Sequence, residues 1–182
     1  MRKDLIRGAL AVLAFTVLLG LAFPLLITGI AQVAFPGKAD GDRSLVARPP
    51  RGPGDFVPRP SQTGYSATGT AFANRGPNQR ATADLTRQHL RAYLARERRY
   101  VPGLTARDVP QDAATFSASG IDPHISPANA RIQAHRVAAV RHLPLDKVMK
   151  LVDEHTDGRA LGLFGEPGVN VADLDAALDQ EA

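Results

Sequence analysis

GALAVLAFTVLLGLAFPLLITGIAQVAF, residues 8–35, decides the architecture of this chain. It belongs to a longer run, residues 8–37, that contains no ionisable side chain. About 20 helical residues cross the roughly 30 Å hydrocarbon core of a bilayer, so the segment is long enough to span it even with tilt and a kink at Pro24. We therefore predict a transmembrane anchor over residues 8–36, preceded by a basic N-terminus at residues 1–7.

A cleaved signal peptide is the alternative interpretation of the same segment. Arg2, Lys3 and Arg7 would form its basic n-region, and residues 10–23 have the length of its apolar h-region. However, the apolar run continues well beyond the point at which a signal peptide turns polar, and residues 29–31 are only a tolerable cleavage site. We therefore expect a retained, single-pass anchor in the cell membrane.

The orientation of the anchor is not decided by charge, because Lys and Arg residues nearly balance on its two sides. A long domain can be translocated largely regardless of its charge, so residues 38–182 can cross the membrane while the compact basic N-terminus stays inside. We therefore expect the N-terminus in the cytoplasm and residues 38–182 on the extracytoplasmic side.

Composition excludes several classes of function. The 182 residues include 22 Lys and Arg and 18 Asp and Glu, and the net charge of +4 is too weak and too evenly spread to indicate nucleic-acid binding. The absence of Cys excludes disulfide scaffolds, thiolate zinc sites and cysteine nucleophiles. The 16 Gly and 14 Pro indicate a loop-rich domain with one modest core.

A proline-rich stretch follows the apolar segment. Its prolines, glycines and arginines favour extended backbone over helix or central strand, so we interpret residues 37–62 as a tether. Residues 63–182 then form a soluble domain. Its first part, residues 64–79, is rich in small polar residues with scattered aromatics such as Tyr65 and Phe72, and it is expected to be an ordered loop with room for one short strand.

Helical signals begin in the middle of the soluble domain. The first predicted helix has Thr82 as its N-cap and runs to about Arg99, before Pro102. Its arginines at positions 87, 91 and 98 share one face, which we interpret as solvated. A second helix is predicted from Ser126 as N-cap, with a proline at its first position, to about residue 142.

The C-terminal part adds two helices and a strand. A third helix is predicted from about Leu145 to a stop at Gly158. Glycine-rich turns lead to a short strand at residues 168–171, and Asn170 caps a last helix. The predicted fold class is therefore α+β, with a single transmembrane helix followed by a small soluble domain.

The search for catalytic machinery is negative. The chain contains no GxxxxGK[ST], GxGxxG, HExxH or GxSxG motif. His124 and His135, even with Asp122 nearby, have no recognised metal-binding geometry, so we expect no metal site. Ser117 and Ser119 have no base close in sequence and are interpreted as loop residues. We therefore expect no catalytic residues. The case for an enzyme rests only on a serine and several histidines in one domain.

Four groups of sequence motifs occur along the chain, and their order is that of a known protein family. The membrane segment carries PL..TG..Q..FP at residues 24–36, and RPS and NRGPN stand at residues 59–61 and 74–78. Residues 117–138, SASGIDPHISPANARIQAHRVA, and residues 155–179, HTDGRALGLFGEPGVNVADLDAALD, are the longest. Together they resemble the KdpC family, the C subunit of the bacterial Kdp potassium-transporting ATPase, over nearly the whole chain.

Two departures from the family pattern stand out. Residues 41–60 lack the usual Gly-Ser-Leu-Ile start and the Leu-Ile-Gly-Gln-x-Phe stretch that follows it, which puts the contacts of this part in doubt. Asp175 stands where the family has Asn.

The resemblance implies a non-catalytic accessory subunit of a potassium uptake complex. Its implied partners are a P-type ATPase subunit, a potassium-channel-like subunit and the lipid bilayer. The family is also described as a catalytic chaperone that raises the ATP affinity of the pump subunit. This implies ATP as a shared cofactor, with contacts at Gln133, Ser117, Ser119 and Gly120.

The implied ATP role conflicts with the expected orientation of the anchor. A domain outside the cell cannot meet cytoplasmic ATP, so its effect would have to pass through the membrane-embedded subunits as a coupling free energy. The alternative function is an exported, membrane-anchored binding module that acts outside such a complex.

Overall fold

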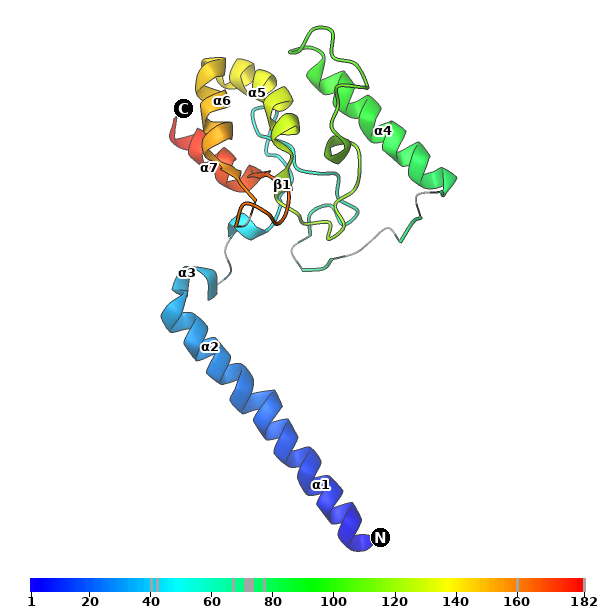
Figure 1. Ribbon diagram of the computed structural model, residues 1–182, viewed down its shortest axis with the longest axis vertical. Helices are drawn as coiled ribbons and strands as arrows, with labels where there is room; N and C mark the ends of the chain where they lie inside the picture. Colours follow the sequence, from blue (N-terminus) through cyan, green and yellow to red (C-terminus); the bar gives the residue numbers. More distant parts are fainter. Residues whose placement is uncertain are drawn as a thin grey trace. The chain divides into compact units, whose positions relative to one another are not determined.

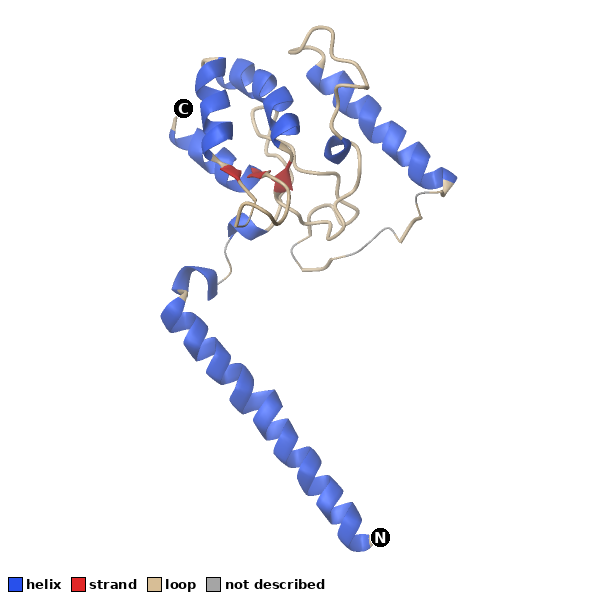
Figure 2. Ribbon diagram, viewed as in Figure 1, coloured by secondary structure: helices blue, strands red, loops and turns tan. Residues whose placement is uncertain are grey.

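The computed structural model describes residues 1–39, 41, 43–66, 68–70, 74–76, 78–159 and 161–181, so Phe72 lies outside the described residues. The chain divides into two compact units, Met1–Asp42 and Arg43–Ala182. Helices make up most of the regular structure, and short strands occur in the second unit (Figure 1, Figure 2).

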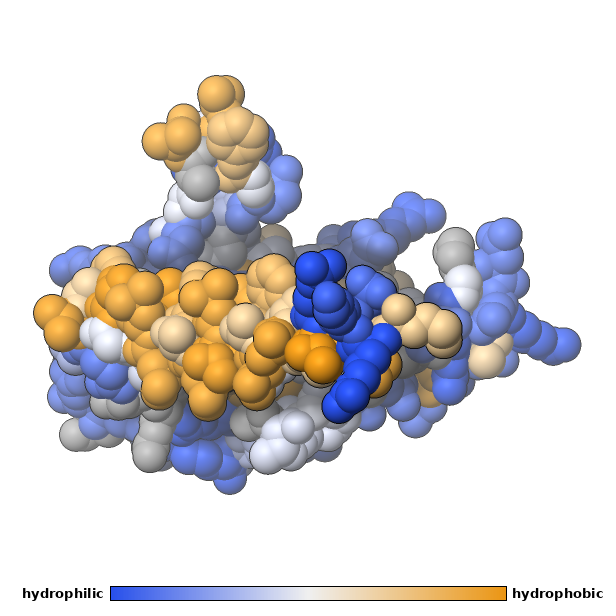
Figure 3. All heavy atoms as spheres, turned by 90° about the horizontal axis from the view of Figure 1, so that it is seen from below, coloured by the Kyte–Doolittle hydropathy of each residue, from blue (hydrophilic) through white to orange (hydrophobic). Residues whose placement is uncertain are grey.

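The first unit is dominated by one long apolar helix. α1 (Arg2–Val17), the π-helical turn η1 (Leu18–Ala22) and α2 (Phe23–Ala34) follow one another over 33 residues, and the short α3 (Pro36–Ala39) comes next. At 1.5 Å per residue this helix is about 50 Å long, which exceeds the roughly 30 Å of a bilayer core. It is long and apolar enough to cross a membrane, and Figure 3 shows its surface as apolar except at one end.

The π-helical turn has a local cause in Pro24. A proline inside a helix lacks the N–H donor, and its ring clashes with the carbonyl four residues earlier. The turn that precedes Pro24 is widened accordingly, because the N–H of Phe23 donates to the carbonyl of Leu18, five residues back. The long helix thus accommodates the proline.

Four longer helices and two short turns shape the second unit. They are η2 (Arg43–Leu45), α4 (Arg80–Glu97), η3 (Gln111–Ala113), α5 (Pro127–Arg141), α6 (Leu145–Glu154) and α7 (Val171–Gln180). Two predicted starts are confirmed. The hydroxyl of Ser126 accepts from the N–H of Asn129 at 3.2 Å at the start of α5, and the side chain of Asn170 accepts from two backbone N–H groups of α7.

Two helix boundaries differ from the prediction. The N-cap of α4 is Gln79, three residues before the predicted N-cap Thr82, and the Thr82 hydroxyl instead donates to the carbonyl of Gly76 at 3.1 Å. α6 ends at Glu154 rather than near Gly158, because the next residues pair with another strand.

A small antiparallel sheet completes the fold. β1 (His124–Ile125) and β2 (Thr156–Asp157) flank β3 (Gly168–Asn170) in the order β1-β3-β2. Val169 faces both neighbours, pairs with Ile125 and Thr156, and is fully buried. The combination of helices with this sheet confirms the α+β class. Only β3 was predicted, and the described part of residues 64–79 contains no strand.

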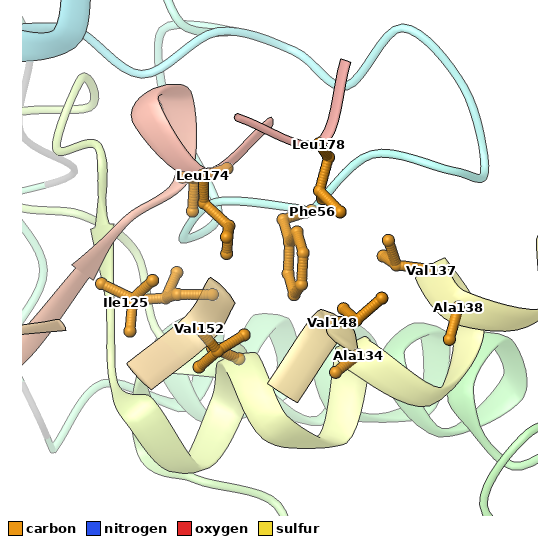
Figure 4. Packing of buried hydrophobic residues seen from close by; sticks show 12 residues of the cluster. Phe56, Ile125, Ala134, Val137, Ala138, Val148, Val152, Leu174 and Leu178 are labelled. Carbon is orange, nitrogen blue, oxygen red and sulfur yellow. The ribbon is translucent and has the colours of Figure 1, made fainter. Parts of the chain in front are cut away.

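The main core lies among α5, α6, α7 and the sheet (Figure 4). Its buried members are Phe56, Ile125, Ala130, Ala134, Val137, Ala138, Val148, Val152, Val169, Val171, Leu174 and Leu178. The three alanines stand four residues apart on α5, so a stripe of small side chains lets α6 approach this helix closely. A second cluster forms under α4 from Tyr93, Leu94, Leu104 and Ala113.

Residues 43–62 are part of the folded unit, which corrects the interpretation of residues 37–62 as a tether. The ring of Phe56 lies at the centre of the main core (Figure 4) and is completely buried. Asp55 is also buried, and the N–H of Ala47 donates to the carbonyl of Ile121 at 2.8 Å. Residues 46–62 contain no helix or strand, as their composition predicted, whereas α3 and η2 occupy parts of residues 37–45. The composition gave no sign that the extended residues pack against α5 and α7.

Candidate functional site

The loop at residues 117–122 is organised by serine hydroxyls. Ser117 is buried, and its hydroxyl accepts from the N–H groups of Gly120 at 3.1 Å and Asp122 at 3.3 Å. The Ser119 hydroxyl accepts from the N–H of Ile121 at 3.2 Å. Both hydroxyls thus hold the loop in shape, which agrees with their interpretation as loop residues.

Gly120 joins this loop to the proline-rich segment. Its φ of +76° favours glycine, and a Cβ atom here would lie 2.8 Å from the hydroxyl oxygen of Thr63. Its carbonyl accepts from the Ser61 hydroxyl at 2.6 Å, and the N–H of Ser117 donates to the carbonyl of Pro60 at 2.9 Å. A side chain at position 120 would therefore require Thr63 to shift.

Gln133 lies on the buried polar side of α5 and is 1% exposed. Its amide oxygen accepts from the N–H of Val57 at 2.8 Å and from Arg136 at 2.9 Å. Its amide nitrogen donates to the carbonyl of Val57 at 3.0 Å and to the side-chain oxygen of Asn129 at 2.9 Å. An amide side chain has two donor and two acceptor positions, so all four are occupied.

A buried ion pair lies one turn further along α5. Nε of Arg136 donates to both carboxylate oxygens of Glu97 at 3.1 and 3.2 Å, and both side chains are almost completely buried. The guanidinium also donates to the carbonyls of Pro53 and Asp55. One arginine therefore ties α4, α5 and the proline-rich segment together.

The sequence analysis did not identify this ion pair. Glu97 is a charged residue that lies among three arginines at the end of α4, where an exposed role was the natural expectation. A usable signal was present on α5, because Asn129, Gln133 and Arg136 are spaced by four and three residues and so share one helix face.

A cavity of about 130 Å³ borders the amide of Gln133. Tyr65, His89, Tyr93 and Arg96 are among its lining side chains. This volume is well below the roughly 300 Å³ of the smallest ordinary ligand pockets, so it cannot hold a nucleotide. The cavity beside Gln133 is therefore too small for a nucleotide in this conformation, and Ser117, Ser119 and Gly120 are not among the residues that line it.

A second cavity, of about 300 Å³, lies between the proline-rich segment and α7. Arg51 and Arg141 bridge Asp55 to Asp179 here, with N–O distances between 2.7 and 2.9 Å. Hydrogen bonds, first from Arg51 and then from Arg141, lower the pKa of Asp179 to about 2. Part of the wall of this cavity is thus formed by paired charges.

Asp175 stands next to this network without an arginine partner. Its carboxylate accepts from the N–H of Phe56 at 3.0 Å. Burial raises the pKa of Asp175 to about 7, and the nearby charge of Asp55 acts in the same direction. Burial therefore leaves the Asp175 carboxyl group less ionised at neutral pH than an exposed aspartate.

The histidines considered for metal binding are not brought together. His124 lies 3.5 Å from Asp122 and 3.6 Å from Asp157, whereas His135 projects from α5. Among the described residues, no group of three or more His, Asp or Glu side chains is arranged to hold a metal ion.

Comparisons with known proteins cover both units of the chain. A family model described as "K+-transporting ATPase, c chain" matches residues 5–180. Proteins named potassium-transporting ATPase KdpC subunit from Koribacter versatilis and Polaromonas naphthalenivorans are 40% and 43% identical to this chain, over 98% and 97% of its length and 95% of theirs. A protein of the same name from Nitratidesulfovibrio vulgaris is 42% identical over 96% of the chain and 93% of its own length. The chain therefore belongs to the KdpC family.

Proposed function

We propose that this chain is a single-pass, non-catalytic subunit of an ATP-driven potassium uptake pump. The observation that carries the proposal is the family match over residues 5–180, which includes both the apolar helix and the folded unit. The KdpC relatives are named as subunits of a potassium-transporting ATPase, and the chain is similar to them from end to end. Its partners would be a P-type ATPase subunit and a potassium-channel-like subunit.

The apolar helix supports a role in assembly within the bilayer. Its surface is unburied in this chain, so lipid or the membrane-embedded partners would cover it. We place the N-terminus in the cytoplasm and the folded unit outside, because a long domain can be translocated largely regardless of its charge.

An effect on ATP affinity would then be indirect. The folded unit would stabilise one conformation of the membrane-embedded subunits, and the pump subunit would bind ATP more tightly in that conformation. All four hydrogen-bonding positions of the Gln133 amide are paired within the chain, which supports the indirect route over direct nucleotide contact.

Assembly is tested by a charge in the apolar helix. Arg in place of Leu18, near the middle of the span, costs about 2.5 to 3.5 kcal/mol on insertion scales. We expect L18R to lower the recovery of the chain with the pump subunits during affinity purification, while the matched L18V variant is recovered normally. Full recovery of L18R in the complex would contradict a role of the helix in assembly.

Topology is tested by a single cysteine. The chain has no Cys, so Ser66→Cys in the described loop after the proline-rich segment provides a unique target. A thiol reagent that cannot cross the membrane should label this cysteine in intact cells. Labelling only after lysis would place the folded unit in the cytoplasm and reopen direct contact with ATP.

A further inference from the structure

The connection between β2 and β3 exposes large apolar side chains. Leu161, Leu163 and Phe164 are 90%, 76% and 65% exposed. We call these three residues the apolar tip. The largest exposed apolar patch of a soluble monomer is commonly functional, which makes the apolar tip a candidate contact surface.

The base of this connection is held in place. Thr156 and Asp157 of β2 pair with β3. Nη2 of Arg159 donates to both carboxylate oxygens of Glu166 at 2.9 and 3.0 Å, and the N–H of Gly162 donates to the carbonyl of Arg159 at 3.0 Å. The apolar tip is therefore presented on a hydrogen-bonded base.

The apolar tip lies at the end of the second unit that receives the chain from the apolar helix. The side chain of Asn170, at the end of β3, donates to the carbonyl of Ser44 in η2 at 2.8 Å. Phe164 is six residues from Asn170, so it lies at most about 20 Å from this contact. In Figure 1 the orange-to-red loop between β2 and β3 is beside the cyan turn η2.

A further exposed leucine lies at the same end. Leu45, in η2, is 58% exposed. Among the described residues of the second unit, the large exposed hydrophobic side chains are Leu45, Leu145, Leu161, Leu163 and Phe164. Four of these five thus belong either to η2 or to the connection between β2 and β3, and the end of β3 contacts η2 through Asn170 and Ser44.

The connection to the membrane span is short. Nine residue steps separate Ala34, the last residue of α2, from Arg43, and they extend to at most about 30 Å. The end that carries the apolar tip is therefore tethered within reach of the bilayer surface.

A bilayer suits the apolar tip better than a protein partner does. Three apolar side chains at a loop tip are few beside the roughly 20 to 30 residues a side that form a standard protein interface. Shallow insertion of a few Leu and Phe side chains into the headgroup region does not require so large a contact surface.

We propose that the apolar tip, with Leu45 beside it, inserts into the interfacial region of the bilayer and orients the folded unit over the membrane. The chain then touches lipid at two places, through its span and through the apolar tip. This inference requires the membrane span but not the potassium pump, so it can be tested on the full chain in lipid alone.

The chain has no Trp, so Phe164→Trp introduces a single fluorescent reporter of similar shape. The full-length variant is placed in nanodiscs that contain lipids brominated near the headgroup end of the acyl chain. We expect at least about twofold stronger quenching than for Lys150→Trp, a matched control on the exposed face of α6, because an inserted side chain meets the bromine atoms.

A second variant separates insertion from proximity. Leu161→Ser and Leu163→Ser in the Phe164→Trp background should return quenching to the control value. Both residues are exposed, so the urea midpoint of the folded unit should stay unchanged. Equal quenching at positions 164 and 150 would overturn the proposal. So would protection of the tryptophan from acrylamide only when the pump subunits are present, because the apolar tip would then be a protein contact.

Discussion

Replacement of Asp175 by Asn should stabilise the folded unit at neutral pH. The Asp175 carboxyl, on α7, is partly buried, and burial raises its pKa to about 7, with Asp55 adding to this effect. The N–H of Phe56 and the charges of Arg141 and Arg51 act in the opposite direction but do not cancel it. An Asn side chain keeps the oxygen that accepts from Phe56 and removes the charge that burial disfavours.

The sign and the size follow from linkage. An unfolded Asp titrates near pH 3.9, so between about pH 4 and pH 7 the folded chain binds more protons at this site than the unfolded chain. The contribution of Asp175 to stability therefore falls as the pH rises through this window, and the penalty is complete above pH 7. A rise of about three pH units at about 1.4 kcal/mol each sets an upper bound of about 4 kcal/mol. Because the carboxyl lines a cavity open to solvent, we expect about half of that, ~2 kcal/mol.

Urea denaturation of the full chain in detergent, followed by circular dichroism at pH 4.5 and pH 8, measures this difference. The Asp175→Asn variant should exceed the wild type by about 2 kcal/mol at pH 8 and by much less at pH 4.5, because other titrating groups cancel in the comparison. Asp173→Asn, at an exposed position in the first turn of the same helix, is the control: loss of a negative charge at a helix N-terminus should not stabilise the chain. A variant no more stable than the wild type at pH 8 would refute the reasoning.

Three further predictions concern the polar contacts of α5 and its neighbours. Glu97→Gln should destabilise the folded unit by about 3 to 5 kcal/mol, since it leaves Arg136 buried without its counter-charge, and a midpoint close to wild type in urea would contradict this. Gln133→Ala should lower the free energy of unfolding by about 3 kcal/mol, because several buried partners lose a hydrogen bond at once. The control is Gln88→Ala at an exposed position of α4, which should lower it by under about 0.5 kcal/mol. Gly120→Ala should lower the free energy of unfolding by about 1 to 3 kcal/mol in the same assay. Because the added Cβ meets Thr63, Thr63→Ala in the same chain should recover part of this loss.

The sequence predicted those elements whose signals are local. Ser126 followed by Pro127 marks the start of α5, because an N-cap hydroxyl and a fixed φ act within one turn. Asn170 marks the start of α7 for the same reason. The apolar helix was evident from length alone, since nothing but a bilayer or a large core accommodates so long a run without charge.

The sequence could not predict the path of the proline-rich segment. Extended, proline-rich backbone forms no internal hydrogen bonds, so its composition does not reveal whether water or another element will satisfy its polar groups. In this chain the carbonyls of Pro53 and Asp55, and both backbone groups of Val57, are bound by side chains of α5, more than 70 residues away. β1 and β2 were missed for a related reason, because two-residue strands are defined by their partner rather than by a periodic pattern.

The structure gives Gln133 and the loop at residues 117–120 a role in holding the chain together, whereas the ATP contacts implied by the family stay a prediction. Gln133 and the loop at residues 117–120 are involved in one set of contacts, but these contacts hold the proline-rich segment and present no free polar group to a nucleotide. The residues Asn129, Gln133 and Arg136 form a polar face of α5 opposite its stripe of buried alanines. This face positions the backbone of the proline-rich segment much as a neighbouring strand would.

This arrangement changes how a functional defect at Gln133 must be interpreted. If Gln133→Ala lowers the apparent ATP affinity of an assembled pump, the loss has two sources that activity alone cannot separate: a broken nucleotide contact, or a displaced proline-rich segment that alters the surface presented to the pump subunits. Phe56→Leu separates them, because it loosens the same segment through the apolar core without touching Gln133. An equal loss of ATP affinity in both variants, matched by an equal loss of stability, is what the indirect route requires. A loss of ATP affinity confined to Gln133→Ala would instead indicate that the Gln133 amide contacts the nucleotide directly.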